Sequence, residues 1–461
     1  AVASALMHVL LKENLADRDY LAGYTDFNNE LEDHLETKTP EWASAISGVS
    51  AEEIIEFARL IGCNPKTYYR FGYGFTRSRN GAFNMHAASC LPAMTGAWKY
   101  KGGGGLYSNS ELCKLDKTMI VGSDVVDPDT RVLDQSRIGE ILCGNPVDLQ
   151  GGPPITALLI QNTNPMMVSP SSVKVKKGFE RDDLFVCVHE QFLTETAAMA
   201  DIVLPATTFL EHEDIYVAGG HTFLQVTKPV IQPYADAKPN HFVICELAKR
   251  LGAQHAGFKM TAWEIIDETL KLSGFPEAET IHQQHWLDCA RDFDEAHFLT
   301  GFETPDKKFH FSPNWSRLGK INATLPKFPD HYAVTDTRSD IKPFRLVTAP
   351  ARQFLNSSFT ETATSKKREG RPTVKIHSDI CDQLQVNDGD LVRIGNDQAS
   401  ILLHVEIYNE LQKDVVIVES IWPSENFIEG LGINALVSSD PGHGIGGAVF
   451  HDTAIWIKTD S

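Results

Sequence analysis

The chain of 461 residues is too long for a single hydrophobic core, and its length predicts roughly two to four domains. Its hydrophobic fraction (42%) and charged fraction (22%) are ordinary for a globular protein, whereas its formal net charge is −19. That charge argues against nucleic-acid binding, which needs basic patches. No apolar run reaches the roughly 18 residues of a membrane-spanning helix. We therefore expect no nucleic-acid partner and no membrane insertion by this chain.

The eight cysteines are dispersed, and none lies within four residues of another. This spacing excludes CxxC and iron–sulfur motifs, so we expect no metal held by this chain's own side chains. Most of these cysteines stand in apolar surroundings, which fits reduced core cysteines in a reducing compartment. No nucleophile elbow, Walker loop or zincin motif is present, and the sequence identifies no catalytic residue.

Residues 1–150 are predicted to form a Rossmann-like α/β domain. The chain opens directly inside an amphipathic helix, without an initiator Met, a helix cap or a signal peptide, so we expect this domain to be incomplete at its N-terminus. A strand at residues 67–71 is followed by Gly72 and Gly74. Glycines after a strand let a phosphate approach the backbone, although a tight βα turn explains the same pair.

Residues 151–340 are predicted to form a second α/β segment that binds a cofactor, followed by a connecting region. Strands at residues 155–160 and 185–188 end beside polar groups, at Asn164-Pro165 and at Glu190. Ligands of open α/β sheets bind at the carboxyl ends of the strands. A carboxylate such as Glu190 can accept hydrogen bonds from the amino and imino donors of guanine. An ordinary βαβ corner with solvated acids is the alternative.

Two further features of this segment carry expectations. Residues 239–252 are predicted to form an amphipathic helix that ends at Gly252, with an inward face made of Phe242, Val243, Leu247, Ala248 and Leu251. Proline, aspartate and threonine punctuate residues 304–343, which predicts a linker.

Residues 341–461 are predicted to be rich in β-structure. Apolar, β-prone runs favour strands at residues 344–348, 373–376, 391–395, 400–407 and 415–419. The turn sequence Asn387-Asp388-Gly389-Asp390 separates two of these runs. A polar stretch, Arg352–Ser358, follows the first of them and offers hydrogen-bond donors.

The ordered motifs HEQFLTETA, ADIVLP, ARQFLNSSF and NALVSSDPGHGIGG resemble the molybdopterin oxidoreductases of the dimethyl sulfoxide reductase family, to which many formate dehydrogenases belong. The stretch FGYGFTRSRNGAFNMHAASCLPAMTG resembles the same family. The implied fold is α/β: two Rossmann-like parallel-sheet segments, followed by a C-terminal double-psi β-barrel that binds a dinucleotide. One departure concerns the acidic residue that follows the strand at residues 185–188. It is commonly Asp in relatives and is Glu190 here.

The resemblance implies a molybdenum or tungsten oxidoreductase that performs two-electron redox chemistry or oxygen-atom transfer on a small substrate. Its cofactor would be molybdopterin guanine dinucleotide, two per full enzyme. A 4Fe-4S cluster and the metal's protein ligand are expected upstream of residue 1, so that residues 1–461 alone would be inactive. The implied partner is an iron–sulfur electron-transfer subunit. The expected location is cytoplasmic, or periplasmic if a twin-arginine signal lies upstream.

The resemblance also indicates which residues hold the cofactor. Those expected to bind it are Asn164, Pro165, His189, Glu190, Thr194, Asp201, Thr348, Arg352, Gln353, Phe354, Asn356, Ser357, Ser358, Asn426 and Asn434. Those expected at the substrate funnel are Arg77, Asn80 and His86, with a structural role favoured for His86.

Two other functions fit parts of the sequence. A non-catalytic scaffold of an electron-transfer complex would share the fold, but would be expected to lack polar cradle residues such as Asn164 and Arg352. An NAD-dependent dehydrogenase requires GxGxxG and an acid about twenty residues later. The Gly72-Tyr73-Gly74 turn has no third glycine in register, which disfavours that function.

Overall fold

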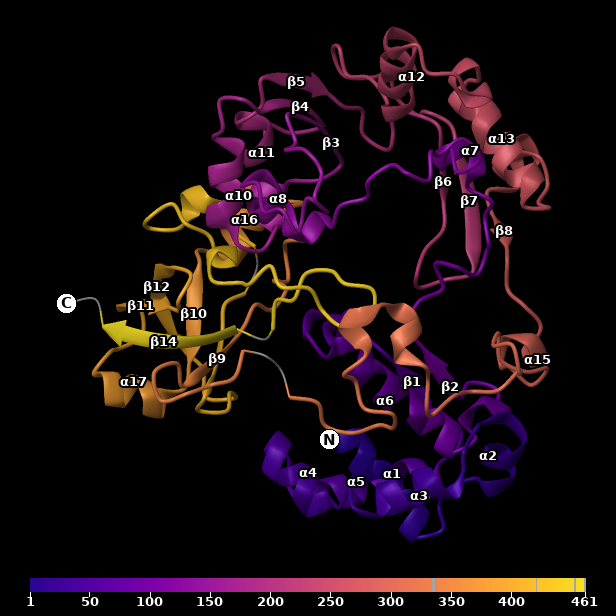
Figure 1. Cartoon of the computed structure of the whole chain (residues 1–461), viewed down its shortest axis with the longest axis vertical. Coiled ribbons are helices and arrows are strands. Elements are labelled where there is room, and N and C mark those ends of the chain that lie inside the picture. Colours follow the sequence, from indigo (N-terminus) through magenta and orange to yellow (C-terminus); the bar gives the residue numbers. More distant parts are fainter. Residues whose placement is uncertain (334–335, 420, 452, 460–461) are drawn as a thin grey trace.

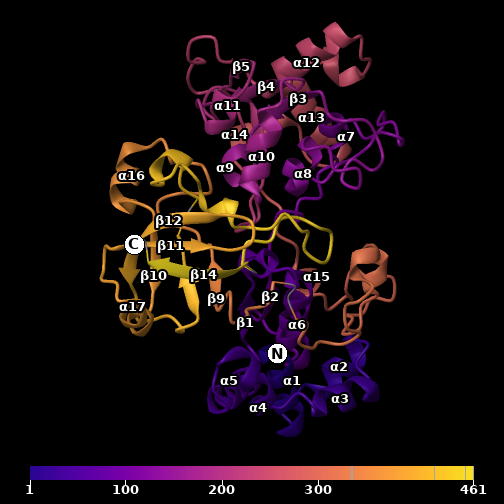
Figure 2. The same ribbon diagram turned by 60° about the vertical axis from the view of Figure 1, so that its left-hand side comes forward.

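The computed structural model describes residues 1–333, 336–419, 421–451 and 453–459. Figures 1 and 2 show the N-terminal helices at the bottom of the molecule, a parallel sheet (β3–β5) at the top, and a barrel beside them. Within the described ranges, no helix combines the length and hydropathy needed to cross a membrane.

The N-terminal region, residues 1–106, is mostly helical. Asp17, Asn28, Thr39 and Ser50 each precede a helix and accept a hydrogen bond from a backbone N–H of its first turn, which explains where these helices begin. The helices are α1 (Val2–Lys12), α2 (Arg18–Tyr24), α3 (Asn29–Glu36), α4 (Pro40–Ser47), α5 (Ala51–Cys63) and α6 (Gly81–Met94). The parallel sheet of this fully described stretch consists of two short strands, β1 (Tyr68–Arg70) and β2 (Gly104–Leu106).

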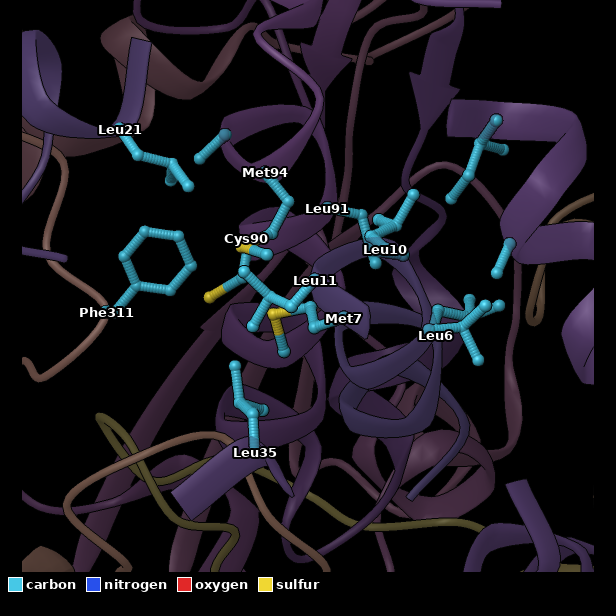
Figure 3. Packing of buried hydrophobic residues seen from close by; sticks show 14 of the residues in the cluster. Leu6, Met7, Leu10, Leu11, Leu21, Leu35, Cys90, Leu91, Met94 and Phe311 are labelled. Carbon is cyan, nitrogen blue, oxygen red and sulfur yellow. The ribbon is translucent and has the colours of Figure 1, made fainter. Parts of the chain in front are cut away.

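The core of this region draws on a distant part of the chain. Leu6 and Met7 of α1 pack with Cys90 of α6 and with Phe311 (Figure 3). Phe311 is fully buried. The expectation of a linker over residues 304–343 is therefore wrong for this part of it, because burying large aromatic side chains outweighs the local tendency of proline and aspartate to form loops.

The second region is a parallel sheet in the order β3–β4–β5. Its strands are β3 (Ala157–Gln161), β4 (Phe185–Glu190) and β5 (Ile202–Pro205). Helices α8 (Ile138–Leu142), α9 (Pro165–Val168), α10 (Ser172–Phe179) and α11 (Glu195–Ala198) accompany it. Val186 and Val188 of β4 are buried against these helices, so the second predicted α/β segment is present.

A third region contains an antiparallel sheet in the order β6–β7–β8. The strands are β6 (Asp214–Tyr216), β7 (Phe223–Thr227) and β8 (Leu287–Asp288), and the helices are α7 (Thr118–Val121), α12 (Asn240–Leu251), α13 (Ala262–Leu272), α14 (Ala278–Gln284) and α15 (Phe293–Ala296). Phe242 and Leu251 of α12, expected to face inward, are exposed. Val243 and Ala248 are buried, so the expectation is confirmed for these two residues and wrong for Phe242 and Leu251.

The fourth region confirms the predicted C-terminal barrel. Six strands close in the order β10–β12–β11–β14–β9–β13. They are β9 (Phe344–Val347), β10 (Thr373–Ile376), β11 (Leu391–Gly395), β12 (Ser400–Ile407), β13 (Val415–Ile417) and β14 (Thr453–Thr459). Helices α16 (Ala363–Glu369) and α17 (Ser378–Leu384) lie at its outside. Closure leaves no free edge, and the interior is filled by aliphatic side chains such as Leu346 and Ile394.

Candidate functional site

A cavity of about 1050 Å³ lies where three of these regions meet. Its walls come from the turn after β1, from β3 and the turn that follows it, and from the loops that leave β9 and precede β14. The lining side chains come from residues 73–77, 134–138, 158–165, 168–170, 348–351, 354–358, 421, 434 and 445–451. A space of this size accommodates a dinucleotide, at the carboxyl end of a parallel strand where such ligands bind.

Nine of the residues predicted from the sequence line this cavity. They are Arg77, Asn164, Pro165, Thr348, Phe354, Asn356, Ser357, Ser358 and Asn434. These residues range from position 77 to position 434 in the chain, and the fold brings them together around one cavity.

Asn434 provides a buried and unsatisfied polar atom at the cavity. Its Nδ2 donates to the carbonyl oxygen of Met167 at 3.0 Å, and the residue is 2% exposed. Its Oδ1 has no hydrogen-bond partner in the described structure. Buried polar atoms are nearly always paired. Asn434 therefore presents an acceptor that a donor on a bound molecule would satisfy.

Asn164 shapes the turn after β3. Its Oδ1 accepts a hydrogen bond of 2.7 Å from the hydroxyl of Thr196 on α11, and the Thr196 hydroxyl oxygen in turn accepts from the backbone N–H of Met166 at 3.1 Å. The residue is buried. Asn164 thus fixes the path of the chain at the cavity wall through a closed hydrogen-bond network.

The polar stretch after β9 forms the wall that the barrel contributes. Asn356 adopts a left-handed conformation with φ of 51°, and Asn356 and Ser358 are exposed. Phe354 is buried edge-to-face against Trp422, with ring centres 4.9 Å apart, and anchors the stretch in the barrel core. The anchored aromatic leaves the amide and hydroxyl groups beside it free to face a ligand.

Arg77 and His451 form the charged corner of the cavity. The backbone carbonyl oxygen of Arg77 accepts hydrogen bonds of 2.8 Å from the N–H groups of Phe450 and His451, and its guanidinium lies 5.2 Å from the centre of the Phe450 ring. Burial and, next, the charge of Arg77 lower the pKa of His451. Its imidazole is therefore neutral at pH 7. His451 was not identified from the sequence, although it lies just after the glycine-rich motif NALVSSDPGHGIGG.

The loop before β14 is held in place by Asn322, which lies 122 positions before Gly444 in the chain. The backbone N–H of Gly444 donates to Oδ1 of the fully buried Asn322 at 2.6 Å, and Asn322 Nδ2 donates back to the Gly444 carbonyl at 2.7 Å. Gly444 has φ of 97°, and a Cβ there would lie 2.9 Å from Ala82. Only glycine suits that position without strain.

Four predicted residues at β4 and β5 do not line the cavity. His189 is fully buried: Nε2 donates to the Lys238 carbonyl at 2.9 Å, and Nδ1 accepts from Gln161 at 3.0 Å. Asp201 accepts from the backbone N–H of Val186, and Thr194 caps α11. Glu190 lies at the end of β4 and accepts from the backbone N–H of Gln191 at 2.7 Å. The structure gives His189, Asp201 and Thr194 structural positions, and the guanine contact of Glu190 stays a prediction.

Five other predicted residues lie outside the lining. Arg352 and Gln353 lie in the chain between the lining residues Ala351 and Phe354 without lining the cavity themselves, and Asn426 is exposed on the surface. The side-chain amide of Asn80 donates to the Tyr332 carbonyl at 2.6 Å. His86 is buried in α6, where Nε2 donates to the His310 carbonyl at 2.8 Å and burial lowers its pKa. These bonds place Asn80 and His86 in the packing around the helical region.

Comparisons with known proteins agree with this arrangement. Residues 1–250 match the family described as molybdopterin oxidoreductase, and residues 344–454 match the molybdopterin dinucleotide binding domain. The chain belongs to the molybdopterin oxidoreductase family. The second match covers barrel strands β9 to β13 and the cavity-lining loops that leave β9 and precede β14.

Named relatives of this molybdopterin oxidoreductase chain include three curated proteins. It is 32% identical to the probable oxidoreductase YoaE of Bacillus subtilis, over 99% of this chain and 66% of that protein. It is 26% identical to the trimethylamine-N-oxide reductase of Haemophilus influenzae, over 90% and 57%. It is also 26% identical to the F420-dependent formate dehydrogenase subunit alpha of Methanocaldococcus jannaschii, over 90% and 62%. The chain therefore spans between about half and two thirds of the length of these relatives.

A solved structure shares the fold. Acetylene hydratase from Pelobacter acetylenicus superposes with a TM-score of 0.79, over 99% of this chain and 70% of that one, at 16% identity. The likeness extends over the N-terminal, sheet and barrel regions together.

Proposed function

We propose that this chain forms the cradle for molybdopterin guanine dinucleotide in a molybdenum or tungsten oxidoreductase. The supporting observation is the cavity itself, in which residues predicted from separate motifs line one space between the β3–β5 sheet and the barrel. Family membership supplies the class of cofactor. When bound, the metal of that cofactor takes or gives two electrons.

The lining residues fit such a cofactor chemically. Asn356, Ser357 and Ser358 supply donors for a pyrophosphate, and Arg77 supplies a positive charge. The unpartnered Oδ1 of Asn434 accepts from a pterin or guanine N–H. Glu190 is our proposed guanine acceptor at the end of β4. In each case the protein binds and orients the group, as is usual for cofactor enzymes.

The substrate and partners are also proposals. Relatives include a trimethylamine-N-oxide reductase and formate dehydrogenase alpha subunits, so we propose a small-molecule substrate and an iron–sulfur electron-transfer partner. We further propose that a 4Fe-4S cluster and the metal's protein ligand are supplied from outside residues 1–461, and that the enzyme acts in the cytoplasm.

The test uses full-length protein expressed with molybdate or tungstate. Bound metal is measured by mass spectrometry, and guanine nucleotide is measured by chromatography after acid release. We expect two guanine nucleotides per metal atom, with at least about tenfold weaker retention in Asn356→Ala and Ser358→Ala, because each loses a donor at the cavity. Asn387→Ala is the matched control, since Asn387 is an exposed asparagine of the barrel region that lies outside the lining. Folded protein without metal and guanine nucleotide would instead support the scaffold alternative.

A further inference from the structure

Gln161 and His189 form a hydrogen-bonded pair at the carboxyl end of the β3–β5 sheet. The two residues stand opposite each other in register on β3 and β4, the neighbouring strands at the top of Figure 1. Nε2 of Gln161 lies 3.0 Å from Nδ1 of His189. Gln161 lines the cavity, whereas His189 is fully buried and does not line it. The pair therefore connects the interior of the sheet to the cavity wall.

The partner of the other ring nitrogen determines the tautomer of His189. Nε2 lies 2.9 Å from the backbone carbonyl oxygen of Lys238, which can only accept a hydrogen bond. Nε2 therefore carries the ring proton. Among the described residues His189 forms no ion pair, and a buried charge without a partner is unfavourable. The ring is therefore neutral, and its Nδ1 is left as a lone-pair acceptor.

This tautomer fixes the orientation of the Gln161 side-chain amide. Because Nδ1 of His189 accepts a hydrogen bond, the part of the amide that faces it is the NH2 group rather than the carbonyl oxygen. Turning the amide over would set two acceptors against each other. Oε1 of Gln161 is thus directed away from His189, and it has no hydrogen-bond partner within the described part of the chain. At this position the cavity receives an acceptor and not a donor.

The barrel side of the cavity presents a second acceptor of the same kind, the unpartnered Oδ1 of Asn434. Two amide oxygens suit a ligand whose ring edge carries N–H donors. The aminopyrimidinone edge that guanine and pterin share has an amino and an imino donor, whereas adenine has a lone pair in place of the imino group. A site built from such acceptors rejects a ring without the donors, because its own polar atoms are then left unpaired.

We propose that Gln161 is a specificity-determining residue of the cavity, whose Oε1 accepts a hydrogen bond from the aminopyrimidinone edge of a bound guanine or pterin, and that His189 positions it. This inference rests on the proposed cofactor cradle and adds to it a residue that the sequence motifs do not mark. His189, which was expected to bind the cofactor directly, instead acts through Gln161.

Replacing Gln161 in the full-length protein tests the contact. Protein expressed with molybdate is dialysed, and the release of guanine nucleotide is followed by chromatography. We expect Gln161→Leu to release it at least about tenfold faster than the parent protein, because one hydrogen bond to the ligand is lost. Gln283→Leu is the matched control, because Gln283 also donates through Nε2, to Glu279, and is exposed outside the cavity. Release from Gln161→Leu at the parent rate would overturn the proposal. A folded parent protein without guanine nucleotide would instead contradict the proposed function, and this inference with it.

The form of the loaded cofactor separates the two sources of the donor edge. A host that attaches no nucleotide to the pterin supplies the protein with the pterin form alone, and pterin release is measured by fluorescence. Faster release of this form from Gln161→Leu would assign the contact to the pterin. Faster release of the dinucleotide form only would assign it to the guanine.

A double-variant cycle tests the positioning role of His189. His189→Leu removes the acceptor for the Gln161 amide, so we expect release to be faster by about the same factor as in Gln161→Leu. In the Gln161→Leu background it should add no further change, because two residues that act as one unit are not additive. His189→Gln should restore slow release, because an amide can donate to Lys238 and accept from Gln161. Fast release from folded His189→Gln, or a further increase in the double variant, would overturn the positioning role.

Discussion

The barrel and the β3–β5 sheet are built from strands of similar composition, yet one is closed and the other is open. In the barrel each of six strands has two neighbours, and Leu346 and Ile394 are fully buried. In the sheet β3 and β5 each have one neighbouring strand, and Leu159 is 42% exposed. The comparison teaches that apolar strands alone do not indicate whether both sides of a sheet are sealed. The order of the strands does indicate this, because it determines which strands have a free edge and which face the helices cover.

We expect the largest effect when a buried leucine of the barrel and a partly exposed leucine of the β3–β5 sheet are each replaced by alanine and the free energy of unfolding is compared. Leu346→Ala leaves a cavity in the barrel core and should lower the free energy of unfolding by about 2–5 kcal/mol. Leu159→Ala in β3 should lower it by about 1 kcal/mol or less, because the side chain is already 42% exposed to water. Urea unfolding followed by circular dichroism measures both. If Leu159→Ala lowered the free energy of unfolding as much as Leu346→Ala does, Leu159 would be covered in solution.

The same contrast explains how far the sequence predicted the fold. The strands at 373–376, 391–395 and 400–407 were located from their apolar pattern and turns, because hairpin signals are local. The contribution of Phe311 to the helical core was not predictable, because its partners Leu6 and Cys90 lie more than 200 positions away in the chain. Phe242 and Leu251 look inward-facing by helical period, but periodicity does not say whether a neighbouring element is present.

The sequence also predicted the candidate site only in part. Asn356 and Asn434 belong to family motifs, Asn164 sits in the turn after β3, and all three line the cavity. His189 does not line it, although it opens the motif HEQFLTETA. Its side chain alternates onto the face of β4 where Lys238 and Gln161 satisfy both ring nitrogens. The sequence shows that a residue belongs to a motif. Only the structure shows whether its side chain already has hydrogen-bond partners within the protein or is available to a cofactor.

A smaller effect should come from the contact that joins the sheet to the barrel. Glu195 of α11 accepts a hydrogen bond from the backbone N–H of Ser424 through Oε1 at 2.5 Å and one from its hydroxyl through Oε2 at 2.8 Å. Glu195→Gln should weaken the contact by about 1.5–3 kcal/mol, because bonds to a charged group are lost. The rates of backbone amide hydrogen exchange in α11 and in residues 421–427 should both increase, as measured by mass spectrometry.

Glu369→Gln is the matched control for that variant. Glu369 of α16 also accepts from a backbone N–H, that of Gln353, but both residues belong to the barrel region. We expect local exchange at residues 351–355 and unchanged exchange in α11. If Glu369→Gln loosened α11 as much as Glu195→Gln does, the contact between the two regions would not be specific to Glu195.

Asn434→Leu should affect binding far more than stability. The variant loses the bond from Nδ2 to Met167 but also removes the buried, unpartnered Oδ1. These opposing effects should leave a change of about 1 kcal/mol or less in the free energy of unfolding without cofactor. Retention of guanine nucleotide in the full-length protein should nevertheless fall at least about tenfold. Unchanged retention would exclude Asn434 from the cavity's binding surface.

The smallest effect should be a pH dependence at the wall that the barrel shares with the turn after β1. Burial and, next, the charge of Arg77 lower the pKa of His451 below its usual 6.5. The unfolded chain therefore binds the proton more readily, so this contribution to stability is present above pH 6.5 and is lost as pH falls through the folded pKa. Melting temperatures at pH 7.5 and 5.5 should differ less in His451→Gln than in the parent chain. A bound pyrophosphate would favour the protonated imidazole, so the melting temperature of cofactor-loaded protein should fall less toward low pH. An identical fall with and without cofactor would place the phosphates away from His451.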